Sequence, residues 1–150
     1  MSEVIKKTKR QAFSWDPEFK PVLKDLEYYL LKNSGKTSIS NLNLFMLCLG
    51  IGFEAKLKRD VPPRKTDSAR LEHIPDQQMA VIKSIAIADT KGYLVLQDED
   101  AVYDIVEQYA AGGLMILANE IAQQKDFGGW LSAKLYTQSK NVNKILVADV

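Results

Sequence analysis

Cysteine and histidine are scarce in this sequence: 150 residues contain one of each. A single cysteine, Cys48, excludes an internal disulfide framework and the paired-cysteine motifs of zinc ribbons. A single histidine, His73, excludes the HExxH motif and sites built from several histidines. We therefore expect no metal site of these types and no bound cofactor.

Long apolar runs are also lacking. The longest one covers residues 42–53 and contains two glycines, whereas a helix that crosses a bilayer needs about 20 apolar residues. The first residues are basic and polar and do not form the apolar segment of a secretory signal. Neither end carries a lipidation motif. These observations predict a protein that does not enter a membrane and that resides in the cytoplasm.

Charges of both signs are plentiful and almost balanced. Twenty Lys and Arg residues against nineteen Asp and Glu residues give a net charge of +1, which excludes a histone-like nucleic-acid coat and an acidic disordered tail. The distribution is uneven, because residues 1–70 hold 14 basic and 8 acidic residues and residues 71–150 hold 6 and 11. Such a chain could bridge two unlike surfaces, or folding could bring its halves together and cancel the asymmetry.

Apolar residues recur at helical spacing in the first half of the chain. Asp16 and Pro17 are expected to open the first helix, as an acceptor cap followed by proline at the first position. Ser40 is expected to cap a second helix over residues 41–53. This segment is apolar on nearly all sides, which places it at the centre of the fold.

The second half predicts three more helices. One follows Pro75, with Val81 among its buried residues, and Asp98 caps the next. The pair Gly112 and Gly113 is expected to break or kink that fourth helix, so that residues 114–123 form a fifth. The alternative for the glycines is a close approach of two helices where no side chain fits.

These segments predict a mainly α fold. We expect a single compact helical domain of about five helices, with a long basic loop and a basic N-terminal arm. The arm covers residues 1–15, anchored by Phe13 and Trp15, and the domain covers residues 16–150. The loop, residues 54–75, contains three prolines, and a loop of that length is usually functional or disordered.

The loop carries the strongest candidate binding site of the sequence. Clusters of arginine and lysine bind phosphate oxygens through charge and, for arginine, through paired hydrogen bonds. Base stacking is not supported, because the basic stretch contains no aromatic residue. The alternative is a solvated loop without a ligand. The candidate residues for nucleic-acid or partner binding are Lys56, Lys58, Arg59, Arg64, Lys65 and Arg70.

The string at residues 34–37 (SGKT) looks like the end of a nucleotide-binding P-loop. That motif requires a glycine five positions before Gly35 and a preceding strand. Leu30 occupies the glycine position, and the segment before it reads as helical. A helix C-cap at Gly35 is the better interpretation.

Acidic residues cluster at Asp98, Glu99 and Asp100. The cluster lacks the alternating ligands and the mid-loop glycine of a calcium loop, so capping of the following helix explains it better. Asp104 and Glu107 are expected to form an exposed acidic stripe for a basic partner.

Cys48 and His73 are the remaining catalytic candidates. A Cys–His dyad would require the loop that carries His73 to fold back onto an apolar helix. We expect instead that Cys48 is a buried thiol. No complete catalytic motif is present, and the sequence predicts a protein that is not an enzyme.

Several short strings resemble a known family when taken in order: residues 44–46 (LFM), 50–53 (GIGF), a basic linker, 85–88 (IAIA) and 107–114 (EQYAAGGL). On these strings the sequence resembles the fourth small accessory protein associated with Dnd-type DNA phosphorothioation systems of bacteria. The resemblance implies a non-enzymatic component of a prokaryotic defence module. No catalytic residues are established for that family, so none is transferred to this chain.

We therefore expect an accessory or adaptor subunit of a DNA-modification-linked antiphage defence complex. Its expected partners are larger protein subunits, ATPases or nucleases, and duplex DNA is a further candidate through the basic loop. Two alternatives stay open: a small helical subunit of an SMC-like ABC-ATPase defence complex, and an independent DNA-binding regulator.

Overall fold

A computed structural model shows the fold and describes residues 4–32, 34–62 and 66–148. The chain divides into two compact units, Met1–Ala118 and Asn119–Val150. Arg64 and Lys65, two of the predicted binding residues, lie outside the described residues.

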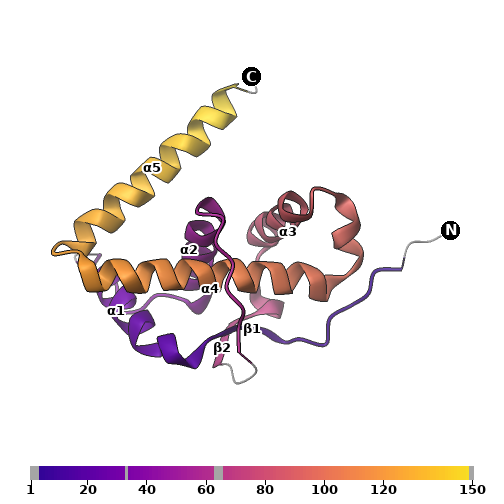
Figure 1. The fold of residues 1–150 in the computed structure, drawn as a ribbon, viewed down its shortest axis with the longest axis horizontal. Coiled ribbons are helices and arrows are strands. Elements are labelled where there is room, and N and C mark those ends of the chain that lie inside the picture. The colour runs from indigo at the N-terminus through magenta and orange to yellow at the C-terminus, as the bar shows by residue number, and fades with distance from the viewer. Residues whose placement is uncertain (1–3, 33, 63–65, 149–150) are drawn as a thin grey trace. The chain divides into compact units, whose positions relative to one another are not determined.

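Helices dominate both units (Figure 1). The elements, in chain order, are β1 (Ala12–Trp15), η1 (Pro17–Phe19), α1 (Lys20–Leu31), α2 (Asn41–Glu54), β2 (Thr66–Arg70), η2 (Leu71–His73), α3 (Asp76–Thr90), η3 (Tyr93–Gln97), α4 (Glu99–Gln123) and α5 (Phe127–Ala148). The prediction of a mainly α fold with about five helices is confirmed. None of the helices in the described part of the chain combines the length and the hydropathy of a membrane span.

Local capping chemistry sets several helix ends. The Ser40 hydroxyl accepts a hydrogen bond from the Asn43 amide at 3.1 Å, as expected for the N-cap of α2. Asp16 accepts from the Glu18 amide at 3.0 Å. It caps the short 3₁₀ helix η1 rather than α1, which begins later than the sequence suggests.

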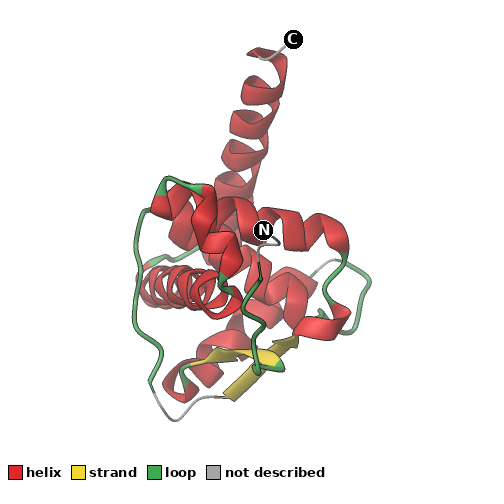
Figure 2. Cartoon of the chain, turned by 90° about the vertical axis from the view of Figure 1, so that its right-hand side faces the viewer, coloured by secondary structure: helices red, strands yellow, loops and turns green. Residues whose placement is uncertain are grey.

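A small antiparallel sheet joins two segments that the sequence predicts as an arm and a loop (Figure 2). In its register, Ala12 pairs with Arg70 and Trp15 with Thr66, with an irregularity between Ala12 and Ser14. The prediction of loop structure throughout residues 54–75 is therefore wrong. It fails because β2 is short and polar, so it carries no periodic apolar pattern.

Aromatic stacking holds β1 against the helices. The Phe13 ring stacks on Phe45 of α2, with centroids 4.2 Å apart, and meets Tyr103 of α4 edge-on at 5.5 Å. Trp15 also contacts Phe45, at 5.6 Å. These side chains are buried, which confirms that Phe13 and Trp15 anchor the N-terminal segment.

Helices α2 and α4 cross with their backbones in contact. A Cβ atom on Gly52 would lie 1.8 Å from the carbonyl oxygen of Tyr109, and one on Gly113 would lie 1.8 Å from the carbonyl oxygen of Cys48. Gly112 faces the carbonyl oxygen of Leu57 in the same way, at 2.0 Å. The predicted break at the glycine pair is wrong, because α4 runs through it without interruption. The close approach is confirmed.

One other expectation differs from the structure. The sequence predicts a buried Val81, but this residue is 47% exposed because the buried face of α3 centres on Ile82, Ile85 and Ala86. The final helix begins at Phe127, because the Asp126 carboxylate accepts a hydrogen bond from the Gly129 amide at 3.0 Å and caps it.

The helix crossing predicts opposite effects for two glycines of the same helix. Gly52→Ala inserts a methyl group into a neighbouring backbone and should destabilise the fold by about 1–3 kcal/mol or more. A Cβ atom added at Gly50 would have no neighbouring atom within 4 Å, so Gly50→Ala should stabilise α2 by about 0.5–1 kcal/mol. Urea unfolding measures both. Equal effects would contradict the crossing.

Candidate functional site

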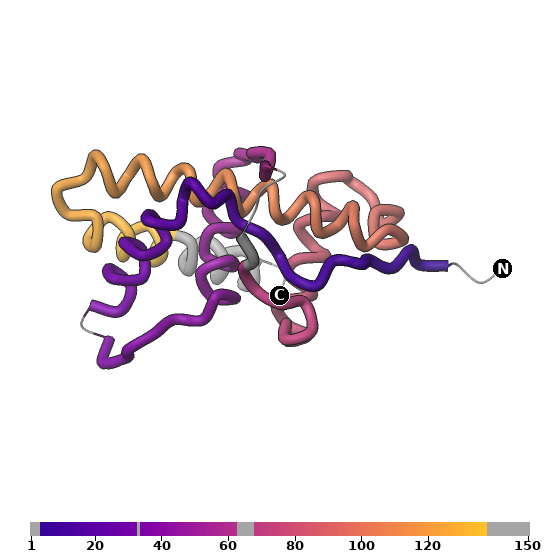
Figure 3. Tube along the Cα trace, turned by 90° about the horizontal axis from the view of Figure 1, so that it is seen from below, coloured from indigo at the N-terminus to yellow at the C-terminus, as the bar shows by residue number. Residues whose placement is uncertain are grey.

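The N-terminal segment lies along the start of α4, where Figures 1 and 3 both show the two chain segments side by side. The Lys6 amide donates to the Gln97 carbonyl at 2.7 Å, and the Glu99 amide donates to the Lys6 carbonyl at 3.0 Å. Lys6 thus forms a short backbone ladder just before α4 begins. We call residues 4–10 the strap.

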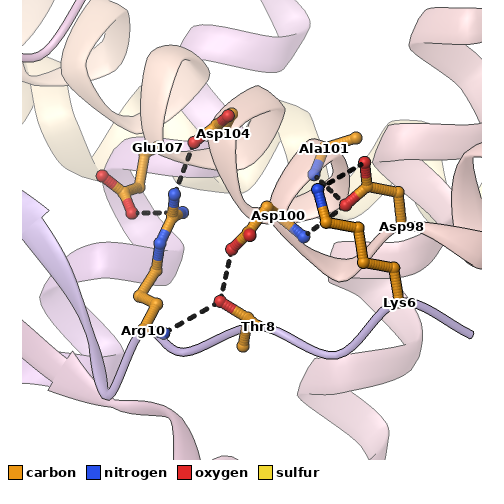
Figure 4. Close-up of polar contacts among 8 residues, drawn as sticks. All are labelled: Lys6, Thr8, Arg10, Asp98, Asp100, Ala101, Asp104 and Glu107. Carbon is orange, nitrogen blue, oxygen red and sulfur yellow. Dashed lines mark hydrogen bonds and ion pairs between the residues drawn. The ribbon is translucent and has the colours of Figure 1, made fainter.

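Arg10 is the centre of the strap's side-chain contacts (Figure 4). Its guanidinium group donates to Glu107 at 2.6 Å and to Asp104 at 2.5 Å. The Arg10 side chain is only 16% exposed and that of Glu107 only 5%. Burying a carboxylate is unfavourable unless an opposite charge pairs with it and donates hydrogen bonds to it, as Arg10 does here. The expected acidic stripe is therefore not open along its length, because this chain's own arginine binds it.

The acidic cluster at the start of α4 caps the helix and binds the strap. Asp98 accepts hydrogen bonds from the amides of Asp100 and Ala101, at 3.1 and 3.3 Å, which confirms the capping interpretation. The Thr8 hydroxyl donates to Asp100 (Figure 4). The Thr8 amide donates to Glu99 at 2.9 Å.

The lysine side chains contribute much less to holding the strap against the start of α4. Lys6 approaches Asp98 at 3.9 Å and Lys7 approaches Glu99 at 3.8 Å, and both lysine side chains are at least 70% exposed. Exposed pairs of this kind contribute about 0–1 kcal/mol. Among the side chains of the strap, those of Arg10 and Thr8 hold it to α4 more firmly than the lysines do.

Lys58 of the predicted basic loop has an internal partner. Its ammonium group lies 3.2 Å from Asp89 of α3 and 5.6 Å from the centroid of the Tyr109 ring. Asp89 also accepts a hydrogen bond from the Tyr109 hydroxyl at 2.5 Å. Burial, and then the contact with Asp89, raises the pKa of Tyr109 to about 12. These contacts tie the start of the loop to α3 and α4.

Arg59 and Arg70 also have carboxylate partners. Arg59 lies 3.6 Å from Asp16 and stacks over the Phe19 ring at 4.7 Å. Arg70 contacts Glu72 at 3.1 Å. Lys56 is exposed and adopts a positive φ of 54° just after α2. Three of the four described candidates thus pair with carboxylates on different elements, and the nucleic-acid role of this set stays a prediction.

Four exposed apolar residues that the sequence did not predict lie on the strap and on η3. Tyr93 and Leu94 are 77% and 78% exposed, and Val4 and Ile5 are 83% and 45% exposed. We call these four residues the strap–η3 surface. The sequence signal of Tyr93 and Leu94 is an apolar string, residues 93–96 (YLVL), between two helices.

A hollow of about 170 Å³ adjoins this surface. Ile5, Leu96 and Val102 supply apolar walls, and Lys7 and Lys83 lie at its edge together with Glu99. A hollow of this size accommodates about one apolar side chain.

The structure does not bring the two catalytic candidates together. Cys48 is fully buried, and burial raises the pKa of its thiol to about 12. The His73 side chain is 74% exposed and lies 3.5 Å from Glu72. Among the described residues, no group of three or more His, Cys, Asp and Glu side chains could hold a metal ion.

The string at residues 34–37 follows a helix rather than a strand. Gly35 has a φ of 77°, and the Lys36 amide donates to the Ser34 hydroxyl at 3.1 Å. The predicted helix C-cap at Gly35 is wrong, because α1 ends at Leu31 and its C-cap is Lys32. A turn after α1 explains these residues.

Comparison with known proteins connects this structure to one family. A family model described as DNA sulphur modification system-associated protein 4 matches residues 29–145. The chain belongs to this family. The resemblance drawn from short strings is confirmed, and the match is longer than those strings. No curated protein and no solved structure matches the chain.

The match to the Dnd-associated family covers α2, α3, α4 and most of α5. It contains both glycines of the helix crossing, Gly52 and Gly113, and the carboxylates of Asp104 and Glu107. Arg10 precedes the matched segment. In this member of the Dnd-associated family, the strap binds to the matched segment through that arginine.

The strap predicts a stability difference between two neighbouring basic residues. Arg10→Ala leaves the buried Glu107 without its arginine and should destabilise the fold by about 3 kcal/mol, the range for a broken buried pair. Lys9→Ala, at an exposed position, should change it by less than about 0.5 kcal/mol. Adding Glu107→Gln to Arg10→Ala should restore part of the loss. Denaturant unfolding tests this, and equal effects of Arg10→Ala and Lys9→Ala would disprove it.

Proposed function

We propose that this protein is a non-enzymatic accessory subunit that docks onto a larger ATPase or nuclease component of the DNA sulphur modification system. Membership of the Dnd-associated family supports association with that system. In this proposal the protein serves a bacterial antiphage defence complex in the cytoplasm. The observation that carries the docking role is the strap–η3 surface.

Exposure of two adjacent large apolar residues supports a protein partner. Tyr93 and Leu94 are each more than three-quarters exposed, and clustered exposed apolar residues are typical of interaction sites. Tyrosine in particular is enriched among the residues that dominate binding energies. The surface therefore favours an apolar contact over a purely electrostatic one.

The charges beside the surface specify the partner's chemistry. Lys7 and Lys83 lie at the hollow next to Ile5, and Lys91 is exposed just before η3. We propose that the partner inserts one apolar side chain into the hollow and places acidic side chains against these lysines. Electrostatic complementarity of this kind gives specificity and a fast association rate.

Internal pairing of the loop's basic residues supports docking over direct DNA binding as the main role. Lys58, Arg59 and Arg70 each have a carboxylate within 3.6 Å, so their charges are partly neutralised within the chain. The buried thiol of Cys48 and the exposed position of His73 support the absence of a thiol-based reaction.

Co-purification with the products of neighbouring genes tests the docking role. The wild-type protein should capture one larger component, and the Tyr93→Ser, Leu94→Ser variant should bind it at least tenfold more weakly, a loss of about 1.4 kcal/mol. Tyr28→Ser is the matched control, since Tyr28 is 62% exposed on α1. Capture that is unaffected by the double variant would contradict the proposed surface, and a wild-type chain that captures none of these products would contradict the docking role.

A further inference from the structure

The contacts of the strap with α4 weaken toward its N-terminal end. Arg10 is the firm end, because its guanidinium group pairs with the buried carboxylate of Glu107. Before it, the side chains of Lys6 and Lys7 are at least 70% exposed and their ion pairs are long. We propose that residues 4–8 open from the start of α4 and close on it as one unit, with Arg10 as the pivot, while the rest of the first unit stays folded.

Polar contacts hold residues 4–8 in place more than apolar burial does. The Lys6 amide donates to the Gln97 carbonyl, and the Lys6 carbonyl accepts from the Glu99 amide. The Thr8 amide donates to the Glu99 carboxylate, and the Thr8 hydroxyl donates to Asp100. Each such bond contributes little net free energy, because an open strap forms hydrogen bonds with water instead. Opening of these residues therefore requires less free energy than unfolding of the whole unit.

The segment that follows the strap is fixed by burial. Val4 and Ile5 are 83% and 45% exposed, whereas Phe13 is fully buried and Trp15 is 5% exposed. The Phe13 ring packs between rings of α2 and α4, so β1 stays in place when the strap leaves. The boundary between the moving and the fixed chain therefore falls near Arg10.

The strap runs between two hollows. Ile5 and Lys7 border the hollow of about 170 Å³, and Thr8 and Arg10 border another of about 430 Å³. This alternation is typical of an extended chain, whose successive side chains point to opposite sides. The two hollows share two wall residues of α4, Glu99 and Tyr103. An opening of the strap therefore joins the two hollows and removes one wall of the smaller one.

This movement regulates the proposed docking surface, and in that respect it rests on the proposed function. Val4 and Ile5 of the strap–η3 surface lie on the part that moves, and Ile5 supplies a wall of the hollow that receives the partner's side chain. The partner therefore binds the closed strap and shifts the population toward it. The fraction of closed molecules sets the apparent affinity for the partner.

Native-state hydrogen exchange of the free full-length protein, followed by NMR at low urea concentrations, tests the opening. Four amides donate hydrogen bonds within the strap or between the strap and α4, those of Lys6, Thr8, Arg10 and Glu99. They should share one protection factor that is independent of urea and at least tenfold below that of the Leu114 amide in the buried part of α4. Protection that rises residue by residue from Lys6 to Arg10 would indicate fraying and would overturn the proposal, as would protection equal to that of Leu114.

Two substitutions at one position test whether residues 4–8 move as a unit. Lys6→Pro removes the amide donor to Gln97 and keeps the carbonyl that accepts from Glu99, whereas Lys6→Gln keeps both groups. Lys6→Pro should lower the protection of the Thr8 and Glu99 amides at least tenfold and leave the Leu114 amide unchanged. Lys6→Gln should change none of the three. An unchanged Glu99 amide in Lys6→Pro, or an equal loss at Leu114, would overturn the proposal.

Capture of the larger component distinguishes this proposal from the docking role. Lys6 belongs neither to the strap–η3 surface nor to the lining of the smaller hollow, so Lys6→Pro acts on the partner through the position of the strap. It should weaken capture at least fivefold, and Lys6→Gln should leave capture unchanged. Undiminished capture by Lys6→Pro with an open strap would overturn regulation by closure. A wild-type chain that captures nothing would contradict the docking role instead, and the exchange experiment then decides on the strap by itself.

Discussion

The contact between the backbones of α2 and α4 is the constraint on which the first unit depends. At Gly52 and Gly113, each helix lies against a carbonyl oxygen of the other, so the helices approach as closely as two helices can. This approach sets where Phe45 of α2 and Tyr103 of α4 lie, and their rings receive Phe13. The position of β1, and of the strap before it, follows from the crossing.

Ion pairs between distant segments then stabilise the arrangement that the packing of α2 and α4 produces. Arg10 binds carboxylates more than ninety residues away in the sequence, and Lys58 binds Asp89. The basic first half and the acidic second half of the sequence thus partly neutralise each other along α4 and the loop. Oppositely charged side chains of the two halves therefore pair within the fold, and the surface proposed for a partner is the apolar strap–η3 surface.

Sequence reasoning succeeds where the signal is local. Ser40 and Asp98 are recognisable as caps because a cap acts within a few residues of itself, and the apolar spacing reveals the helices. It fails where the signal is long-range. The pairing of β1 with β2 needs a register between segments some fifty residues apart, and the sequence of β2 shows no apolar pattern. Likewise, nothing near Arg10 or Glu107 indicates that the two side chains meet, and the exposure of Tyr93 depends on how η3 packs.

We propose that ion pairs hold the strap and the start of the loop against α3 and α4, and that the strap–η3 surface binds a larger subunit. Hydrogen–deuterium exchange of the full chain, free and in the complex isolated with its partner, tests this most directly. The account predicts new protection at residues 4–10 and 93–97 and little change at residues 56–62. Protection confined to residues 56–62, with η3 unchanged, would contradict it.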